Sequence, residues 1–208
     1  RLNLRIGYFY QPFGLNQQTD THATLLQLSN DRLFGSDRDW QVLLYGALTR
    51  RLDYSIGYLL GSGSDHSLEG QSGMAIVRLA LASEWLYQYG WEGGISAVVG
   101  ERVDPHAARR RKSPSMVEPH DSLIATWRTG FDLRKQVASM FGTFTLTTEA
   151  AVGGDEGDPL VSGLAQIDWL HPSRRWGAST QCLSAWQDFP EAETDATDTR
   201  IAAVLTYF

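Results

Sequence analysis

Cysteine is almost absent from this chain of 208 residues, in which Cys182 is the single example. One thiol excludes an internal disulfide framework, and the CxxC spacing typical of zinc and redox sites does not occur. We therefore expect Cys182 to be a buried, unreactive thiol, and we expect no metal and no other cofactor.

Long hydrophobic runs are missing as well. The longest stretch without Asp, Glu, Lys or Arg is 6–19, fourteen residues that include Pro12 and two glycines. A helix that crosses a bilayer needs about 18 to 20 mostly apolar residues. The sequence therefore predicts no membrane-spanning helix.

A strong excess of one charge and a secretion signal are also lacking. The formal net charge of −6 gives no reason to expect nucleic acid as a partner. The chain opens inside a predicted strand without a signal sequence, so we expect the natural amino terminus to lie upstream of Arg1. With 42% hydrophobic residues, the composition supports one domain over 1–208.

What the sequence contains instead is alternation with a period of two. In the first strand, Leu2, Leu4 and Ile6 alternate with polar residues, so one face is apolar and the other is polar. No helical period of comparable length interrupts the later runs. Strands are predicted over 2–10, 40–49, 52–60, 74–86, 91–103, 123–134, 137–152, 160–170, 176–187 and 199–208.

The connections between these strands alternate in length. Short ones are predicted at 50–51, 87–90, 135–136 and 171–175, and long ones at 61–73, 104–122, 153–159 and 188–198. Outer-membrane barrels have short turns on one side and longer loops on the other. A closed ring of strands also satisfies every backbone polar group inside hydrocarbon. The sequence therefore predicts an all-β, antiparallel transmembrane β-barrel.

Aromatic residues and the chain ending favour the same class. Trp85, Tyr87, Tyr89 and Trp91 crowd one short turn, and Trp169 and Trp176 flank another, where an interfacial aromatic girdle is expected. The last run, TRIAAVLTYF, ends on Phe208, as outer-membrane barrels commonly do. Which face of this strand meets lipid stays open, because Val204 and Ala202 on one face and Ile201, Leu205 and Tyr207 on the other are all apolar.

Two segments near the amino terminus carry a resemblance to a known family. RIGYFYQPFGL at 5–15 and THATLLQLSNDRLF at 21–34 are followed by a new strand from Asp39. In this order they resemble the phosphate-selective porin family of Gram-negative outer membranes, over about the first 50 residues. The resemblance implies a porin-type barrel of roughly sixteen strands. Ten strands are visible here, or eleven if 21–33 is itself a strand, so further amino-terminal strands are expected.

The resemblance also implies an inward-folded constriction loop at 13–38 that carries part of an anion site. The family's hydroxyl positions fall on Asp20 and Thr21, and its arginine falls on Leu28 or, with a shift, on Arg32. An aspartate in a constriction repels phosphate. The resemblance therefore supports the porin class and argues against phosphate as the solute.

Charged residues on the polar faces are predicted to line a water-filled lumen. Arg78 and Arg128 each lie in mid-strand, where facing lipid would cost about 2 to 4 kcal/mol. Whether they bind a solute or pair with acidic neighbours stays open. The predicted pore-lining set is Arg5, Asp20, Thr21, Arg32, Asp53, Arg78, Arg128, Asp132, Arg134, Glu149 and Asp168.

These features predict a porin-like channel for passive diffusion of small hydrophilic solutes or ions in the bacterial outer membrane, and not an enzyme. One alternative is a structural or sleeve barrel within an outer-membrane complex. Another is a barrel hydrolase, with His120 or His66 as its candidate group, although adjacent residues of an extended chain point to opposite faces.

Three kinds of partner follow from the class. The basic run at 109–112 is a candidate contact for lipopolysaccharide phosphates, and otherwise a solvated loop. Membrane lipid would cover the apolar face. Porins commonly form trimers, and the smooth residues expected at such a contact are Ala80, Ala82, Ala202 and Val204.

Overall fold

The computed structural model describes residues 2–15, 38–61, 72–103, 123–187 and 196–207. Within them no helix is both long and apolar enough to cross a membrane. The elements are β1 (Asn3–Tyr10), β2 (Arg38–Ala47), β3 (Leu52–Leu59), β4 (Gly73–Leu81), α1 (Ser83–Tyr89), β5 (Trp91–Val103), β6 (Leu123–Ser139), β7 (Gly142–Asp155), β8 (Asp158–Leu170), β9 (Trp176–Gln187) and β10 (Ala196–Tyr207).

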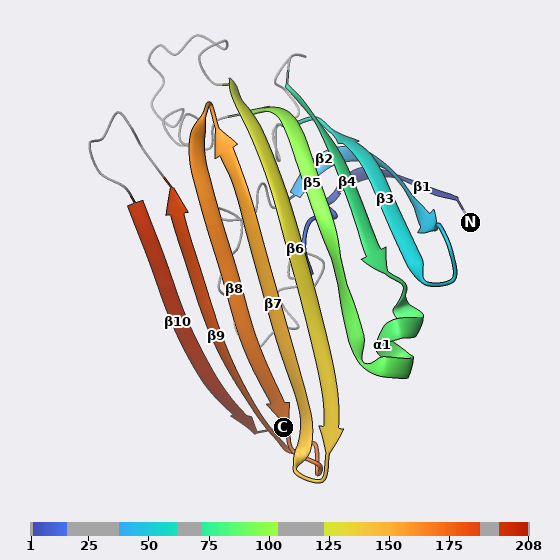
Figure 1. The fold of residues 1–208 in the computed structure, drawn as a ribbon, viewed down its shortest axis with the longest axis vertical. Coiled ribbons are helices and arrows are strands. Elements are labelled where there is room, and N and C mark those ends of the chain that lie inside the picture. The colour runs from blue at the N-terminus through green and yellow to red at the C-terminus, as the bar shows by residue number, and fades with distance from the viewer. Residues whose placement is uncertain (1, 16–37, 62–71, 104–122, 188–195, 208) are drawn as a thin grey trace.

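The ten strands form one antiparallel sheet in which every strand pairs with the next along the chain. Figure 1 shows that the sheet is curved, with β1, β2 and β10 farther from the viewer than the central strands. β1 and β10 each have one neighbour, so the sheet of described strands is not closed. The prediction of an antiparallel all-β fold with ten visible strands is confirmed, and the candidate eleventh strand at 21–33 lies outside the described residues.

Alternate residues of each strand have opposite environments, as β6 illustrates. Trp127 and Phe131 are 49% and 51% exposed, whereas Arg128 and Asp132 are 2% and 1% exposed. The registers pair like with like from strand to strand, because directly opposed residues share a face. We call the face of Arg128 and Asp132 the inner face and that of Trp127 and Phe131 the outer face.

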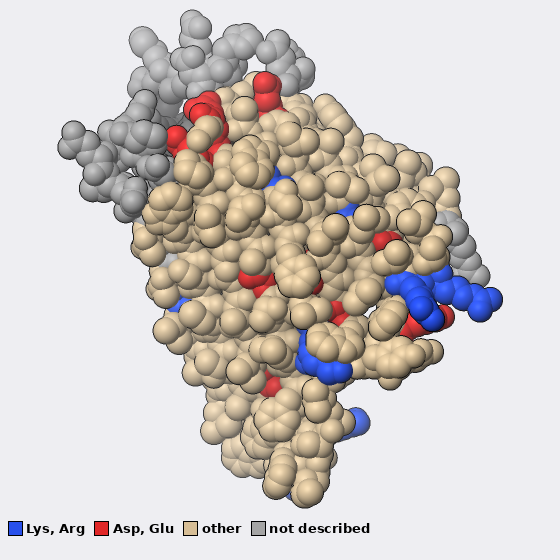
Figure 2. Space-filling view, viewed as in Figure 1, with Lys and Arg blue, Asp and Glu red and all other residues tan. Residues whose placement is uncertain are grey.

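The outer face is the convex one and is almost free of charge. Figure 2 shows this side of the molecule, on which Lys, Arg, Asp and Glu make up little of the surface. Among the strand residues that the structure describes, Arg38, Glu101 and Lys135 are the charged residues placed there by register. Lys135 also donates to the Tyr89 carbonyl at 2.7 Å, beside α1.

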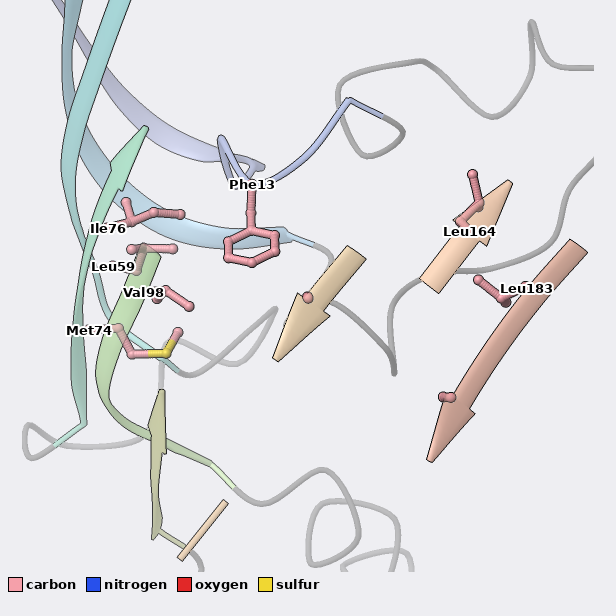
Figure 3. Packing of buried hydrophobic residues seen from close by; sticks show 9 residues of the cluster. Phe13, Leu59, Met74, Ile76, Val98, Leu164 and Leu183 are labelled. Atoms are coloured by element: carbon pink, nitrogen blue, oxygen red, sulfur yellow. The ribbon is translucent and has the colours of Figure 1, made fainter. Parts of the chain in front are cut away.

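The inner face carries a cluster of buried apolar side chains. Its members come from strands on both sides of the curved sheet and from a segment after β1: Phe13, Leu59, Met74, Ile76, Val98, Ala151, Leu164, Leu183 and Ala185. In Figure 3, Phe13 extends between Ile76 and Val98 on one side and Leu164 and Leu183 on the other. Buried apolar side chains of the concave side therefore come from both halves of the sheet, with Phe13 between them.

Three predicted boundaries are wrong. Residues 83–86, expected as strand, belong to helix α1, which has Glu84 in its first turn and ends where Gly90 adopts a left-handed conformation (φ 68°). The β6–β7 turn lies at 140–141 rather than 135–136, because Ser139 Oγ accepts the Phe141 N–H and donates to the Gly142 carbonyl.

The third wrong boundary is the connection between β7 and β8. A long loop was expected at 153–159, but the strands continue to a two-residue turn at Glu156 and Gly157. Both residues have positive φ, 52° and 100°, which suits a tight hairpin. The predicted alternation of connection lengths therefore fails at this position, and 62–71, 104–122 and 188–195 lie outside the described residues.

Two further residue-level expectations are wrong. Cys182 is exposed on the outer face rather than buried. Of the expected trimer-contact residues, Ala82 is buried, and register places Ala80, Ala202 and Val204 on the inner face. The apolar residues of β10 on the outer face are Ile201, Ala203, Leu205 and Tyr207; Phe208 is not described.

Candidate functional site: the inner face of the sheet

All eight predicted pore-lining residues that the structure describes lie on the inner face by register: Arg5, Asp53, Arg78, Arg128, Asp132, Arg134, Glu149 and Asp168. They share this face because the side-chain period of a strand is two and each register preserves the alternation. Asp20, Thr21 and Arg32 lie outside the described residues. The structure therefore brings the described candidates to one side, where they form separate groups.

The central group is built on Arg78. Its guanidinium donates two bonds to Asp132, at 2.5 Å from Nη1 and 2.8 Å from Nη2, and a third bond to Ser96 Oγ at 2.8 Å. Arg78 and Asp132 are both buried. A planar guanidinium matches a carboxylate in this two-pronged geometry, so the two charges compensate each other. Ser96 was not predicted from the sequence, because the candidates were chosen mainly by their charge and serine is neutral.

A second group lies near the β7–β8 turn. Asp155 accepts hydrogen bonds from Arg128 at 2.8 Å, from Arg102 at 3.0 Å and from Thr126 at 2.7 Å. Arg128 also donates to the carbonyl of Gly154 at 2.8 Å. The hydrogen bonds that Asp155 accepts therefore link β5, β6 and β7. Arg102 and Asp155 were not predicted, although their inward parity with Arg128 was a usable signal.

Arg134 forms a third ion pair, at the other end of the sheet. Its Nη1 lies 2.8 Å from Glu92 on β5, and its Nε donates to Thr147 on β7. Both charged side chains are partly exposed. The pair therefore lies in a wetter environment than the one formed by Arg78.

Asp168 belongs to a different kind of group, in which the hydrogen-bond partners of the carboxylate are neutral. Gln166 Nε2 donates to both carboxylate oxygens, at 2.8 and 2.9 Å, and Ser179 donates a short hydrogen bond. Gln181 donates to Gln166 Oε1 at 2.8 Å, which continues the chain of bonds to β9. Sequence reasoning placed Asp168 correctly by parity but not Ser179 or Gln181, which only the β8–β9 register brings beside it.

The segment Gln11–Leu15 crosses the inner face after β1. Phe13 is 1% exposed, and its ring occupies the space beside Gly130, where a Cβ would lie 2.8 Å from it. The Gly14 N–H donates to Ser96 Oγ at 3.3 Å, and the Leu15 N–H donates to Glu149 Oε1 at 3.1 Å. The described part of the expected constriction loop therefore packs against β5, β6 and β7.

Described residues of the inner face form a hollow between β1 and β5, on the side of α1. This cavity has a volume of about 700 Å³, and its charged lining residues are Arg5, Asp53, Arg78 and Glu92. The Arg5 guanidinium lies 4.0 Å from the centre of the Phe9 ring. The cavity ends at Pro12, part of the segment that crosses the face, so this segment forms its wall.

Among the described residues, no group of three or more His, Cys, Asp or Glu side chains is placed to hold a metal ion. The candidate hydrolase residues His66 and His120 lie outside the described ranges. The described inner face offers charged and hydrogen-bonding side chains to a solute.

Comparisons with protein-family models, with curated proteins and with solved structures found no match for this chain.

Proposed function

We propose that this chain forms an outer-membrane β-barrel that acts as a porin-like channel for passive diffusion of small hydrophilic solutes or ions. The observation that carries the proposal is the contrast between the two faces. Outward strand positions in the described chain carry three charged residues, whereas inward positions carry the arginines and carboxylates of the groups above. A lipid-facing charge at the bilayer midplane costs about 2 to 4 kcal/mol, so this sorting fits a sheet with lipid outside and water inside.

The height of the apolar band supports the same proposal. Trp176 and Trp186 are both outward residues of β9 and stand ten positions apart. At a rise of about 3.3 Å per residue this is roughly 33 Å along the strand, or about 25 Å along the axis of a barrel with a tilt near 40°. The lipid-facing band of such barrels is about 25 Å tall and is bounded by aromatic girdles. Tyr207 lies against Trp176, with ring centres 4.7 Å apart, at the lower girdle.

Closure of the barrel is part of the proposal. In the sheet of described strands, β1 and β10 are edge strands, and a backbone group left without a hydrogen bond costs several kilocalories per mole in hydrocarbon. Strands beyond the ten described ones would pair with these edges. The outer membrane is the proposed location because strand-built barrels are characteristic of it.

The test is conductance across a planar lipid bilayer. We expect the purified, reconstituted protein to produce discrete ohmic current steps, and heat-denatured protein to produce none. Insertion without any steady current would contradict the channel and favour the sleeve barrel, in which the lumen is closed by protein.

Phe13 offers a sharper test of the same channel. Because its ring fills the inner face beside Gly130, Phe13→Ala should enlarge the single-channel conductance. Phe144→Ala is the matched control, since Phe144 lies on the outer face and is 41% exposed. Equal conductance in wild type and Phe13→Ala would show that the Gln11–Leu15 segment does not narrow the path.

A further inference from the structure

We propose that Asp168 is the cation-attracting site of the inner face and makes the channel select small positively charged solutes over anions. The inference rests on the proposed channel function and adds the class of solute. The proposed solutes are hydrated monovalent cations and protonated amines, which offer O–H or N–H donors to a carboxylate. Charges on the inner face that are already compensated within the protein have little effect on a passing ion.

Most arginines of the inner face lie against carboxylates within the protein. Arg78 is paired with Asp132 and Arg134 with Glu92, at distances of 2.5 and 2.8 Å, and close opposite charges largely cancel beyond their own dimensions. Arg102 and Arg128 share Asp155, so this group keeps one positive charge. It lies at the β7–β8 turn, at the opposite end of β8 from Asp168.

The hydrogen-bond partners of Asp168 are neutral and do not compensate a charge on its carboxylate. Gln166 and Ser179 donate hydrogen bonds that orient the carboxylate, and no Lys, Arg or His of the described chain forms an ion pair with it. The side chain is half-buried, so it also remains reachable from the lumen.

Gln181 adds an unsatisfied acceptor to the same chain of hydrogen bonds. Its Nε2 donates to Gln166, while its Oε1 is buried and has no hydrogen-bond partner in the described residues. A buried polar atom without a partner costs about 1 to 3 kcal/mol, so this chain has a hydrogen-bond acceptor to spare. The Asp168 carboxylate at its other end attracts a cation and repels an anion.

The rest of this side of the inner face does not offset the charge. On β9 and β10 the inward neighbours of Asp168 are Ser179 and Val204. The inward Arg200 stands four positions away along β10 and is exposed at the sheet edge. Arg5 lies on β1, the first strand, over the Phe9 ring and in the cavity shared with Asp53.

The experiment is the reversal potential in a KCl gradient, measured on the reconstituted protein. We expect wild type to favour K⁺ over Cl⁻, and Asp168→Asn to lower the K⁺/Cl⁻ permeability ratio by about two- to fourfold, the size expected for one unit charge at about 5 Å in salt water. Glu156→Gln is the matched control, because it removes the same charge from the β7–β8 turn. It should leave the ratio unchanged.

A second measurement distinguishes the effect of the charge at position 168 from a folding defect in Asp168→Asn. In a Cys182→Ser background, Asp168→Cys can be modified by an ethylsulfonate or by an ethyltrimethylammonium thiosulfonate reagent. The sulfonate should restore cation preference and the ammonium should not. Two results would overturn this inference and leave the channel intact: an anion preference in wild type, or a K⁺/Cl⁻ permeability ratio that does not change with the charge at position 168. Absence of any current would instead overturn the channel.

Discussion

At the scale of single residues, the interior depends on space left by glycine. Gly130 faces inward opposite Ser96 and Ala151, and the Phe13 ring fills the volume that a side chain would take. Gly163 on β8 is also a strand glycine, but an added Cβ there would meet only the Glu149 carbonyl, at 3.7 Å. The two positions therefore form a natural comparison.

Gly130→Ala should destabilise the fold by about 1 to 3 kcal/mol, because the methyl group overpacks a filled site. Gly163→Ala should be neutral or stabilise the fold by about 0.5 to 1 kcal/mol, since alanine loses less entropy in a strand. Equilibrium urea unfolding in lipid vesicles measures both. Equal effects of the two variants would contradict the packing of Phe13, and the double variant Phe13→Ala/Gly130→Ala should show strong non-additivity.

A second residue-scale prediction concerns the buried pair. Asp132→Asn keeps the shape of the side chain but leaves the Arg78 charge buried without its carboxylate. The loss should be about 3 to 5 kcal/mol, the range for breaking a buried pair from one side. Asp168→Asn, which removes a charge without an ionic partner, should cost less. A smaller loss for Asp132→Asn than for Asp168→Asn in urea unfolding would contradict this ranking.

At the scale of the strand, sidedness is the main property. Ala165 and Gln166 are neighbours in the middle of β8, but Ala165 pairs with Cys182 on the outer face and Gln166 pairs with Gln181 on the inner face. The local sequence is shared, so a difference between substitutions at these positions reports the face alone.

Ala165→Lys should destabilise the bilayer-inserted protein by about 2 to 4 kcal/mol, because it places a cation in hydrocarbon. Gln166→Lys should cost much less, since its side chain reaches the polar inner face beside Asp168. Urea unfolding in vesicles compares them directly. If both lysines are tolerated equally, the outer face does not meet lipid.

Strand sidedness was also the most predictable part of the site. Parity alone placed Arg78, Arg128 and Asp168 on the inner face, because a period of two is visible in any single strand. Boundaries were less predictable. The helix at 83–89 and the turn at 140–141 depend on contacts such as the Gly90 carbonyl accepting the Gln136 N–H at 2.7 Å, which local pattern does not reveal.

At the scale of the whole molecule, the curved sheet separates two environments at the same depth. Cys182 is exposed on the outer face, whereas Ala202 on the neighbouring strand pairs with Gln181 on the inner face. A fluorophore on Cys182 should be quenched strongly by brominated lipids. One on Ala202→Cys in a Cys182→Ser background should be quenched weakly but reached by aqueous iodide. Identical quenching of the two labels would contradict a barrel with lipid outside and water inside.

The sequence by itself determined the class of structure and the sidedness of the strands. Alternation and turn residues are local properties, and they sufficed to predict an antiparallel all-β sheet and its inward residues. Tertiary structure alone decided which charges compensate one another. Gly14 meets Ser96 and Leu15 meets Glu149 across 82 and 134 residues of chain, and Arg78 meets Asp132 across 54. Those contacts depend on curvature and register, which no local pattern encodes, and they leave Asp168 with neutral hydrogen-bond partners.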